Sequence, residues 1–138
     1  MLKFIIGRIR LLLMNQTQYI SYLRAKGVKI GSGCDIAKNA NFGSEPWLIQ
    51  IGNNVRITQR VQFITHDGGL WTLRKMGKIS HDSVKYGKIK IGDNCNISWD
   101  VVILPNVSIG KNCVIAAGAV VTKNIPSGEV WGRGACKK

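Results

Sequence analysis

Two side chains that could handle a proton stand in two short interruptions of an otherwise regular sequence. His66 lies in the segment Thr-His-Asp-Gly-Gly at 65–69, and Glu45 lies in Gly-Ser-Glu-Pro-Trp at 43–47. A histidine that titrates near neutral pH can take a proton from a hydroxyl group, and a neighbouring carboxylate can fix its tautomer or bind the acceptor. By spacing alone, the pattern equally indicates a histidine that ends a strand and forms hydrogen bonds within its loop.

The sequence that surrounds these interruptions repeats every six residues. An apolar residue occupies each beat of the repeat, and the twelve beat residues are Ile30, Ile36, Phe42, Ile51, Ile57, Phe63, Ile91, Ile97, Ile103, Ile109, Ile115 and Val121. A six-residue period does not match the apolar stripe of an amphipathic helix, but it fits one short strand followed by a turn. Because such a unit cannot bury an apolar face alone, the units must stack as a solenoid of about four coils, with three units to a coil.

A second apolar slot lies four residues after each beat. Cys34, Cys95 and Cys113 fall in this slot and are expected to be buried. The sequence contains no Cys-x-x-Cys pair, which argues against a metal site and for unreactive thiols in a reducing cytoplasm. Cys136 stands outside the repeat, and we interpret it as an inert thiol.

The repeat slips at two places, which fall at the same corner of the expected solenoid. The interval to the next beat is nine residues after Phe42 and 28 residues after Phe63. These two residues are the third beats of consecutive coils, so the extra residues should leave the solenoid along one edge. We therefore expect Glu45 and His66 to lie one coil apart on that edge.

The repeat over residues 28–131 resembles that of the hexapeptide-repeat acyltransferases, whose units read aliphatic, small, two variable residues, small apolar, variable. This resemblance implies an all-β fold, a left-handed parallel β-helix. The segments Phe-Ile-Thr-His-Asp-Gly-Gly at 63–69 and Ser-Glu-Pro-Trp at 44–47 are similar to those of the sugar O-acetyltransferase branch, which includes the maltose and galactoside acetyltransferases. In that family the residue matched by His66 is the catalytic base.

The resemblance implies direct transfer of an acetyl group from acetyl-CoA to a hydroxyl of a sugar or of a cell-surface polysaccharide precursor. His66 would deprotonate the hydroxyl, a backbone N–H would stabilise the oxyanion, and no metal would be required. Glu45 and Asp67 complete the set of catalytic candidates. Trp71 and Arg74, in the long insertion, are candidates for binding the acceptor.

The closing coils at 109–126 resemble those that hold coenzyme A in the family. The positions matched by Ala117, Thr122 and Lys123 touch the coenzyme in galactoside acetyltransferase, as does a small residue at the position of Trp99. This tryptophan departs from the pattern, and it could stack on the coenzyme or pack on a neighbouring subunit. Two further candidates, as phosphate partners, are Arg133 and Lys137. The end of the chain departs as well, with alanine at 135 where the family has proline.

The resemblance also implies a homotrimer with active sites at the subunit interfaces. We expect an N-terminal helical segment at 1–27, the β-helix at 28–131 with an insertion loop at 64–88, and a short tail at 132–138. Residues 1–14 are apolar but contain arginines and are too short to span a bilayer. A helix before Gly27 should cap the open end of the solenoid, with a membrane-surface anchor as the alternative.

The formal net charge of +13 indicates an anionic partner. Coenzyme A phosphates fit this charge, and so does an anionic membrane surface, whereas no basic run interleaved with aromatic residues indicates nucleic acid. The expected location is the cytoplasm or its inner membrane surface. Two other functions stay open: a non-catalytic assembly scaffold, and a γ-carbonic-anhydrase-like zinc enzyme, which needs three histidines per site where this sequence has only His66 and His81.

Overall fold

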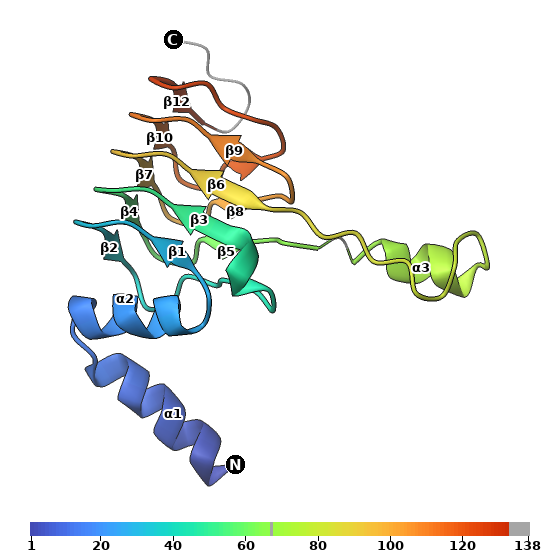
Figure 1. Ribbon diagram of the computed structural model, residues 1–138, viewed down its shortest axis with the longest axis horizontal. Helices are drawn as coiled ribbons and strands as arrows, with labels where there is room; N and C mark the ends of the chain where they lie inside the picture. Colours follow the sequence, from blue (N-terminus) through green and yellow to red (C-terminus); the bar gives the residue numbers. More distant parts are fainter. Residues whose placement is uncertain (67, 133–138) are drawn as a thin grey trace.

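The computed structural model describes residues 1–66 and 68–132, and within the first helix it leaves out the side chains of residues 2–4, 6 and 8. Four residues singled out from the sequence therefore lie outside the described part of the chain: Asp67, Arg133, Cys136 and Lys137. The rest folds as the expected left-handed parallel β-helix, in which three narrow sheets form the sides of a prism (Figure 1).

Each sheet contains one short strand from each successive coil, and all strand pairs are parallel. The first sheet contains β1 (Lys29–Ile30), β3 (Ile49–Ile51), β6 (Ile89–Ile91) and β9 (Ser108–Ile109). The second contains β2 (Asp35–Ile36), β4 (Arg56–Ile57), β7 (Asn96–Ile97), β10 (Val114–Ile115) and β12 (Val130–Trp131). The third contains β5 (Gln62–Phe63), β8 (Val102–Ile103) and β11 (Val120–Val121), and a single bridge from Asn41 to Gln62 extends it into the first coil.

The predicted beat residues fill the interior of the prism. All twelve except Ile30 are buried, and their side chains form one continuous core with those of the second slot. Cys34, Cys95 and Cys113 are buried free thiols, as expected, and the last two donate to the carbonyl oxygens of Gly110 and Pro126 at 3.0 and 3.2 Å. The six-residue pattern therefore predicted both the fold and its core.

Left-handed backbone conformations make the corners. Between the first and second sheets, Asn54, Asn94 and Asn112 stand on consecutive coils with φ values of 54°, 57° and 58°. Asparagine tolerates this region better than other residues with a side chain. The amide of Asn54 donates to that of Asn94 at 3.2 Å, and Asn94 donates to Asn112 at 3.1 Å. The corner is thus an asparagine ladder that runs along the solenoid.

Helix α2 (Gln16–Ala25) covers the N-terminal end of the β-helix, which confirms the capping interpretation for this segment. Its side chains Tyr19 and Leu23 are buried against the first coil. The side chain of Gln16 accepts from the backbone N–H of Ile36 at 3.2 Å and donates to its carbonyl at 2.9 Å. This pair of bonds saturates part of the open edge of β2, which would otherwise attract another strand.

Helix α1 (Leu2–Leu13) precedes the cap and points away from the solenoid (Figure 1). Ile5, Ile9 and Leu12 are exposed on it. No helix among the described residues has the length and apolar character needed to cross a membrane.

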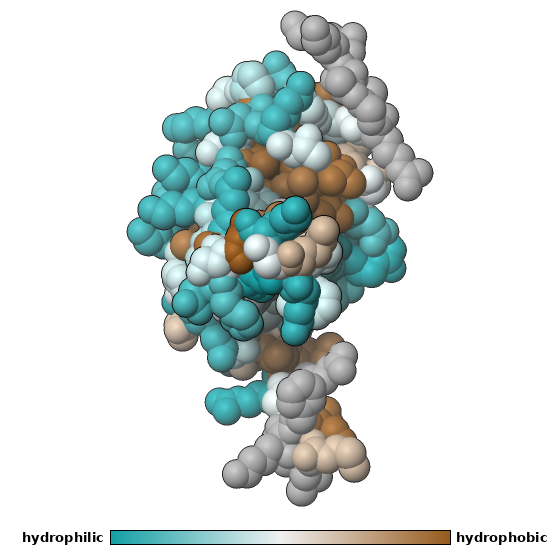
Figure 2. All heavy atoms as spheres, turned by 90° about the vertical axis from the view of Figure 1, so that its right-hand side faces the viewer, coloured by the Kyte–Doolittle hydropathy of each residue, from teal (hydrophilic) through white to brown (hydrophobic). Residues whose placement is uncertain are grey.

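The long insertion at 64–88, which we call the arm, leaves the third sheet after β5 and returns at β6 (Figure 1). It carries the short helix α3 (Leu70–Lys75) at its far end. At its base, His66 forms an antiparallel bridge with Tyr86, and Gly87 N–H donates to the carbonyl of Thr65 at 2.8 Å. Viewed from the side of the arm, the surface is largely hydrophilic, with several separate apolar areas (Figure 2).

The asparagine ladder can be tested at its middle member. Replacing Asn94 with Ala removes two amide contacts and places a less tolerant residue at positive φ, so we expect a loss of about 1–3 kcal/mol in the free energy of unfolding. Asn94→Gly also removes the amide contacts but tolerates positive φ, so its free energy of unfolding should fall by less than that of Asn94→Ala. Urea unfolding followed by circular dichroism would measure both variants. Equal losses for Ala and Gly would mean that the left-handed backbone costs nothing at this corner.

Candidate active site

The two interruptions of the repeat meet at one point on the surface. Both leave the corner between the third and first sheets, and Oε2 of Glu45 lies 2.9 Å from Nδ1 of His66. Glu45 directly precedes a short 3-10 helix at Pro46–Leu48, and His66 opens the arm. The side chain of His66 is 44% exposed and that of Glu45 is 12% exposed. The geometry joins a half-exposed imidazole to a mostly buried carboxylate.

Glu45 is held as an anion by its neighbours. The hydroxyl of Thr65, the one buried polar residue in the described part of the chain, donates to the same Oε2 at 2.6 Å. Hydrogen bonds from Thr65 first, then from His66, lower the pKa of Glu45 from its ordinary value of 4.5 to about 2, against a smaller opposing effect of burial.

This anion decides which imidazole nitrogen carries the proton. A carboxylate can only accept, so Nδ1 of His66 must donate to Glu45. In the neutral imidazole Nε2 is then the unprotonated atom, free to accept a proton. The ring is also steadied by Tyr86, whose ring meets it edge to face with centroids 6.3 Å apart.

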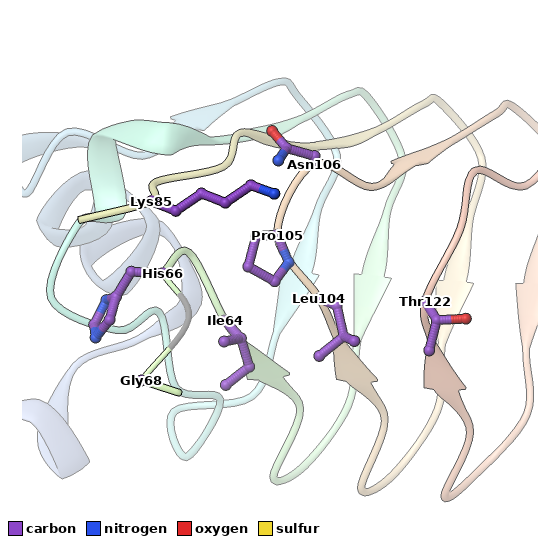
Figure 3. Close-up of a pocket in the computed structure, with 8 residues that line it drawn as sticks. All are labelled: Ile64, His66, Gly68, Lys85, Leu104, Pro105, Asn106 and Thr122. Atoms are coloured by element: carbon purple, nitrogen blue, oxygen red, sulfur yellow. The ribbon is translucent and has the colours of Figure 1, made fainter. Parts of the chain in front are cut away.

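A groove of about 330 Å³ runs from His66 along the solenoid. Its floor consists of Ile64, Leu104 and Thr122, which occupy equivalent positions on three consecutive coils (Figure 3). Lys85, from the returning half of the arm, extends its side chain over the groove. The floor of the groove is therefore mostly apolar, with the hydroxyl of Thr122 at one end, and the rim carries a cation.

The coenzyme candidates from the sequence fall on two different edges of the third sheet. Thr122 lies in the groove, and Lys123 follows it with its Nζ 5.2 Å from the centre of the Trp131 ring. Trp99 and Ala117 lie instead at the corner between the second and third sheets. There Gly118 N–H donates to the carbonyl of Trp99 at 2.8 Å. Within one chain, the structure does not bring the two pairs together.

The corner that holds Trp99 is also occupied by an ion pair. Arg60 lies 5.5 Å from the centre of the Trp99 ring and bonds both carboxylate oxygens of Asp100 at 2.6 Å. This contact holds one face of the indole against the protein's own guanidinium group.

The arm carries the two acceptor candidates away from His66. Trp71 and Arg74 belong to α3, at the far end of the arm (Figure 1). Arg74 donates to the carbonyl of Ser83 and so joins the two halves of the arm, while Lys75 lies over the ring of Trp71 at 5.7 Å. His81, also on the arm, is exposed. In one chain, neither candidate approaches the histidine and glutamate.

Among the described residues, no group of three His, Cys, Asp or Glu side chains could hold a metal ion. The sequence reasoning missed three groups that complete the site, namely Thr65, Lys85 and Tyr86. Thr65 had a visible signal, because a polar residue directly before the histidine must point inward when His66 points outward. Lys85 and Tyr86 had none, since they depend on where the arm returns.

Comparison with known proteins gives a consistent result for the solenoid. Residues 88–123 match the family described as bacterial transferase hexapeptide (six repeats). The chain is 43% identical over 84 residues to protein CapG of Staphylococcus aureus, an alignment that covers 59% of this chain and 47% of CapG. It thus spans about half the length of that curated relative.

Two solved structures share the fold. A maltose O-acetyltransferase from Clostridium difficile 630 superposes with a TM-score of 0.64 and 28% identity, covering 87% of this chain and 72% of that one. A hexapeptide-repeat-containing acetyltransferase from Vibrio cholerae, solved in complex with acetyl coenzyme A, superposes with a TM-score of 0.73 and 23% identity. That superposition covers 91% of this chain and 79% of the other.

The ionised state of Glu45 predicts a specific loss of stability in acid. Because its pKa is about 2 in the folded protein and 4.5 ordinarily, the unfolded chain binds the proton first as the pH falls. Stability contributed by Glu45 is complete above pH 4.5 and is lost toward pH 2, by up to about 3 kcal/mol. Glu45→Gln should lack this part of the pH dependence.

The measurement is the free energy of unfolding between pH 2 and 6 for the native chain and Glu45→Gln. Asp35→Asn is a matched control, since Asp35 lies away from the site. Its carboxylate forms an exposed ion pair with Arg56, with an N–O distance of 3.4 Å. Parallel curves for the native chain and Glu45→Gln would contradict the assignment of a strongly stabilised anion at this position.

Proposed function

This chain belongs to the hexapeptide-repeat transferase family, and from that premise we propose that it is an acetyl-CoA-dependent O-acetyltransferase acting on a sugar hydroxyl. The acceptor would be a sugar or a precursor of a cell-surface polysaccharide. The observation that carries the proposal is the pair of His66 and Glu45 at the end of an apolar groove, with Nε2 left to accept a proton.

In this proposal His66 is the general base. Its Nε2 takes the proton of the acceptor hydroxyl while that oxygen attacks the acetyl carbonyl. The C–S bond of the thioester then breaks, coenzyme A leaves as the thiolate, and the His66 imidazolium returns the proton to this thiolate. The acetyl group thus passes directly to the sugar without an acyl-enzyme. Glu45 keeps Nδ1 protonated and stabilises the imidazolium that forms. The buried hydroxyl of Thr65 holds Glu45 in place for both tasks. Asp67, which follows the base, remains a catalytic candidate by sequence alone.

The groove has the chemistry to hold the donor. Acetyl-CoA supplies the acetyl group as a thioester, whose carbonyl carbon is open to attack by a hydroxyl. Ile64 and Leu104 offer apolar surface to an alkyl chain, and Lys85 and Lys123 are cations near that surface that could pair with phosphates. Arg133 and Lys137 remain further candidates for such a contact.

We propose that the protein acts as a homotrimer. The donor candidates on the two edges of the third sheet would face each other only across a contact between subunits, with Thr122 from one chain and Trp99 and Ala117 from the next. The arm, with Trp71 and Arg74, would reach the acceptor site of a neighbouring chain in the same way. Exposed Val120 on the third sheet supports an interface there.

The name of one relative supports a sugar acceptor. One solved relative is a maltose O-acetyltransferase, and it carries the same solenoid over most of this chain. We take the acceptor class from this maltose O-acetyltransferase and the reaction type from the site.

Replacing His66 with Ala should lower the rate of acetyl transfer by about 100-fold or more, because the step loses its general base. The measurement is thiol release from acetyl-CoA over a panel of sugars, with the folded state and oligomeric mass of the variant matched to the native chain. Glu45→Gln should also slow the reaction, since the tautomer of His66 is then less well fixed. Native protein that neither releases thiol nor binds coenzyme A would contradict the proposal and favour an assembly scaffold.

We also propose that helix α1 binds the inner membrane surface, where polysaccharide precursors would be handled. Ile5, Ile9 and Leu12 follow one another at intervals of four and three residues and are all exposed, so they form an unpartnered apolar stripe. Arg10, near the end of the same helix, and the net charge of +13 favour a surface of anionic lipid.

Replacing both Ile9 and Leu12 with Glu should abolish sedimentation with vesicles that contain phosphatidylglycerol, because it removes apolar contacts and adds repulsion. Met76→Glu is a matched control, since Met76 is an equally exposed apolar residue on the arm. Acetyl transfer to a water-soluble acceptor should stay unchanged. Equal vesicle binding by the double variant and the control would contradict a role for α1.

A further inference from the structure

A second pocket, separate from the groove, lies between the capping helix and the segment that carries Glu45. Its volume is about 540 Å³. We call it the helical pocket, and its characteristic lining residues are Tyr22, Lys26, Lys38, Phe42, Ser44 and Trp47. The reaction steps derived above use none of these side chains.

The helical pocket adjoins the catalytic pair. Ser44 and Pro46, which line the pocket, are the residues on either side of Glu45. Gly43 also lines it, and a Cβ built on Gly43 would lie only 3.5 Å from Oγ1 of Thr65. In Figure 3 the His66 ring is turned away from Leu104 and Thr122, toward the helical end of the solenoid. The pair therefore stands between the groove and the helical pocket.

The walls of this pocket present aromatic surface at a fixed place. Trp47 is 60% exposed, and its backbone and Cβ pack on Gly27, where an added Cβ would lie 3.0 Å from the Cβ of Trp47. Across the pocket, Tyr22 stacks on Tyr19 with ring centroids 6.3 Å apart. Exposed, rigid aromatic faces are suited to packing against the C–H faces of a sugar ring.

The same pocket is positively charged. Nζ of Lys26 lies 5.6 Å from the centre of the Tyr22 ring, and Nζ of Lys38 donates to the carbonyl of Leu12 at 2.6 Å. Each ammonium group has three donors, so both keep donors for a ligand. None of the described residues that line the pocket is acidic. A neutral sugar would leave the remaining donors of these two ammonium groups without an anionic partner.

We propose that the helical pocket is the acceptor subsite and that it binds a sugar bearing a carboxylate or phosphate group. This inference rests on the proposed O-acetyltransferase function and adds the class of its acceptor. Trp47 packs against the sugar ring, Lys26 and Lys38 bind the anionic group, and a hydroxyl of the bound sugar points past Ser44 to Nε2 of His66. The helix that caps the solenoid then also forms one wall of the substrate site.

The first test is steady-state kinetics with glucuronic acid, glucose 6-phosphate and glucose as acceptors. Trp47→Ala should raise the KM for the preferred acceptor by about 10-fold or more and leave the KM for acetyl-CoA unchanged. Lys26→Gln should reduce the preference for the anionic sugars over glucose. Lys90→Gln, an exposed lysine on β6 outside the pocket, is the matched control and should behave like the native chain.

The two anionic acceptors separate the two sources of charge. Preference for glucuronic acid identifies a carboxylate ligand, and preference for glucose 6-phosphate identifies a phosphate ligand. Transfer that occurs but responds to Trp47→Ala and Lys26→Gln no more than to Lys90→Gln would overturn the proposal, as would a consistent preference for glucose. Thermal unfolding checks that Trp47→Ala is folded, and Lys26→Gln alters only an exposed side chain.

A binding measurement separates failure of this subsite from failure of the proposed function. Titration of the same three sugars, followed by nuclear magnetic resonance shifts of the indole N–H groups, should perturb the Trp47 signal most. Binding of an anionic sugar that is lost in Trp47→Ala, without any acetyl transfer, would keep the subsite and reject the transferase activity. Acetyl transfer without any perturbation of the Trp47 signal would keep the transferase activity and reject the subsite.

Discussion

Every coil of this protein depends on the next coil for the partners of its backbone amides. Gly31 N–H donates to the carbonyl of Ile51, Gly52 N–H to that of Ile91, and Gly92 N–H to that of Ile109, all at 2.8–3.0 Å. Such pairing works only if successive coils turn at the same places and present side chains of similar size to the interior. The six-residue beat, the left-handed corners and the need for a cap at the open end all follow from this constraint.

The same constraint explains where the site can form. Extra residues inside a coil would break the pairing of the strands above and below, so they must leave at a corner and return to it. The arm does so over residues 64–88, and β3 still pairs in register with β6, Ile49 opposite Ile89. Function is therefore concentrated where the repeat is interrupted. Thr65 connects the regular coils with the interrupted segments, since its side chain is buried like that of a core residue and also donates a hydrogen bond to the carboxylate of Glu45.

Charge is distributed unevenly between the site and the rest of the molecule. The chain has only seven acidic residues against twenty basic ones, so each carboxylate is a negative charge on a mostly positive molecule. Glu45 is kept ionised by neutral donors and one imidazole, whereas both pockets beside it carry lysines at their rims. An anionic donor on one side and an anionic acceptor on the other would each find a complementary surface, and the partly buried carboxylate of Glu45 would act only on the imidazole.

The repeat made the fold, the core and the corner of the insertions predictable, because each six-residue unit adopts a local conformation and packs on copies of itself. Beat residues such as Ile57 and Ile97 could only face the interior of the solenoid, and their spacing in the sequence predicted this burial directly. The edge shared by Glu45 and His66 followed from counting coils, but the 2.9 Å contact between them did not. Such a contact depends on how two irregular segments settle against Thr65, which no periodic pattern encodes.

What only the tertiary structure decided lies in the same irregular segments. The course of the arm carries Trp71 and Arg74 away from His66, and the width of the third sheet separates Trp99 from Thr122. The packing of α2 on the first coil creates a pocket beside Trp47 that the sequence did not indicate. Sequence alone determined the elements that repeat, because their environment is set by their neighbours in the pattern. The structure decided the positions of the segments that do not repeat, because these depend on contacts between residues far apart in the chain.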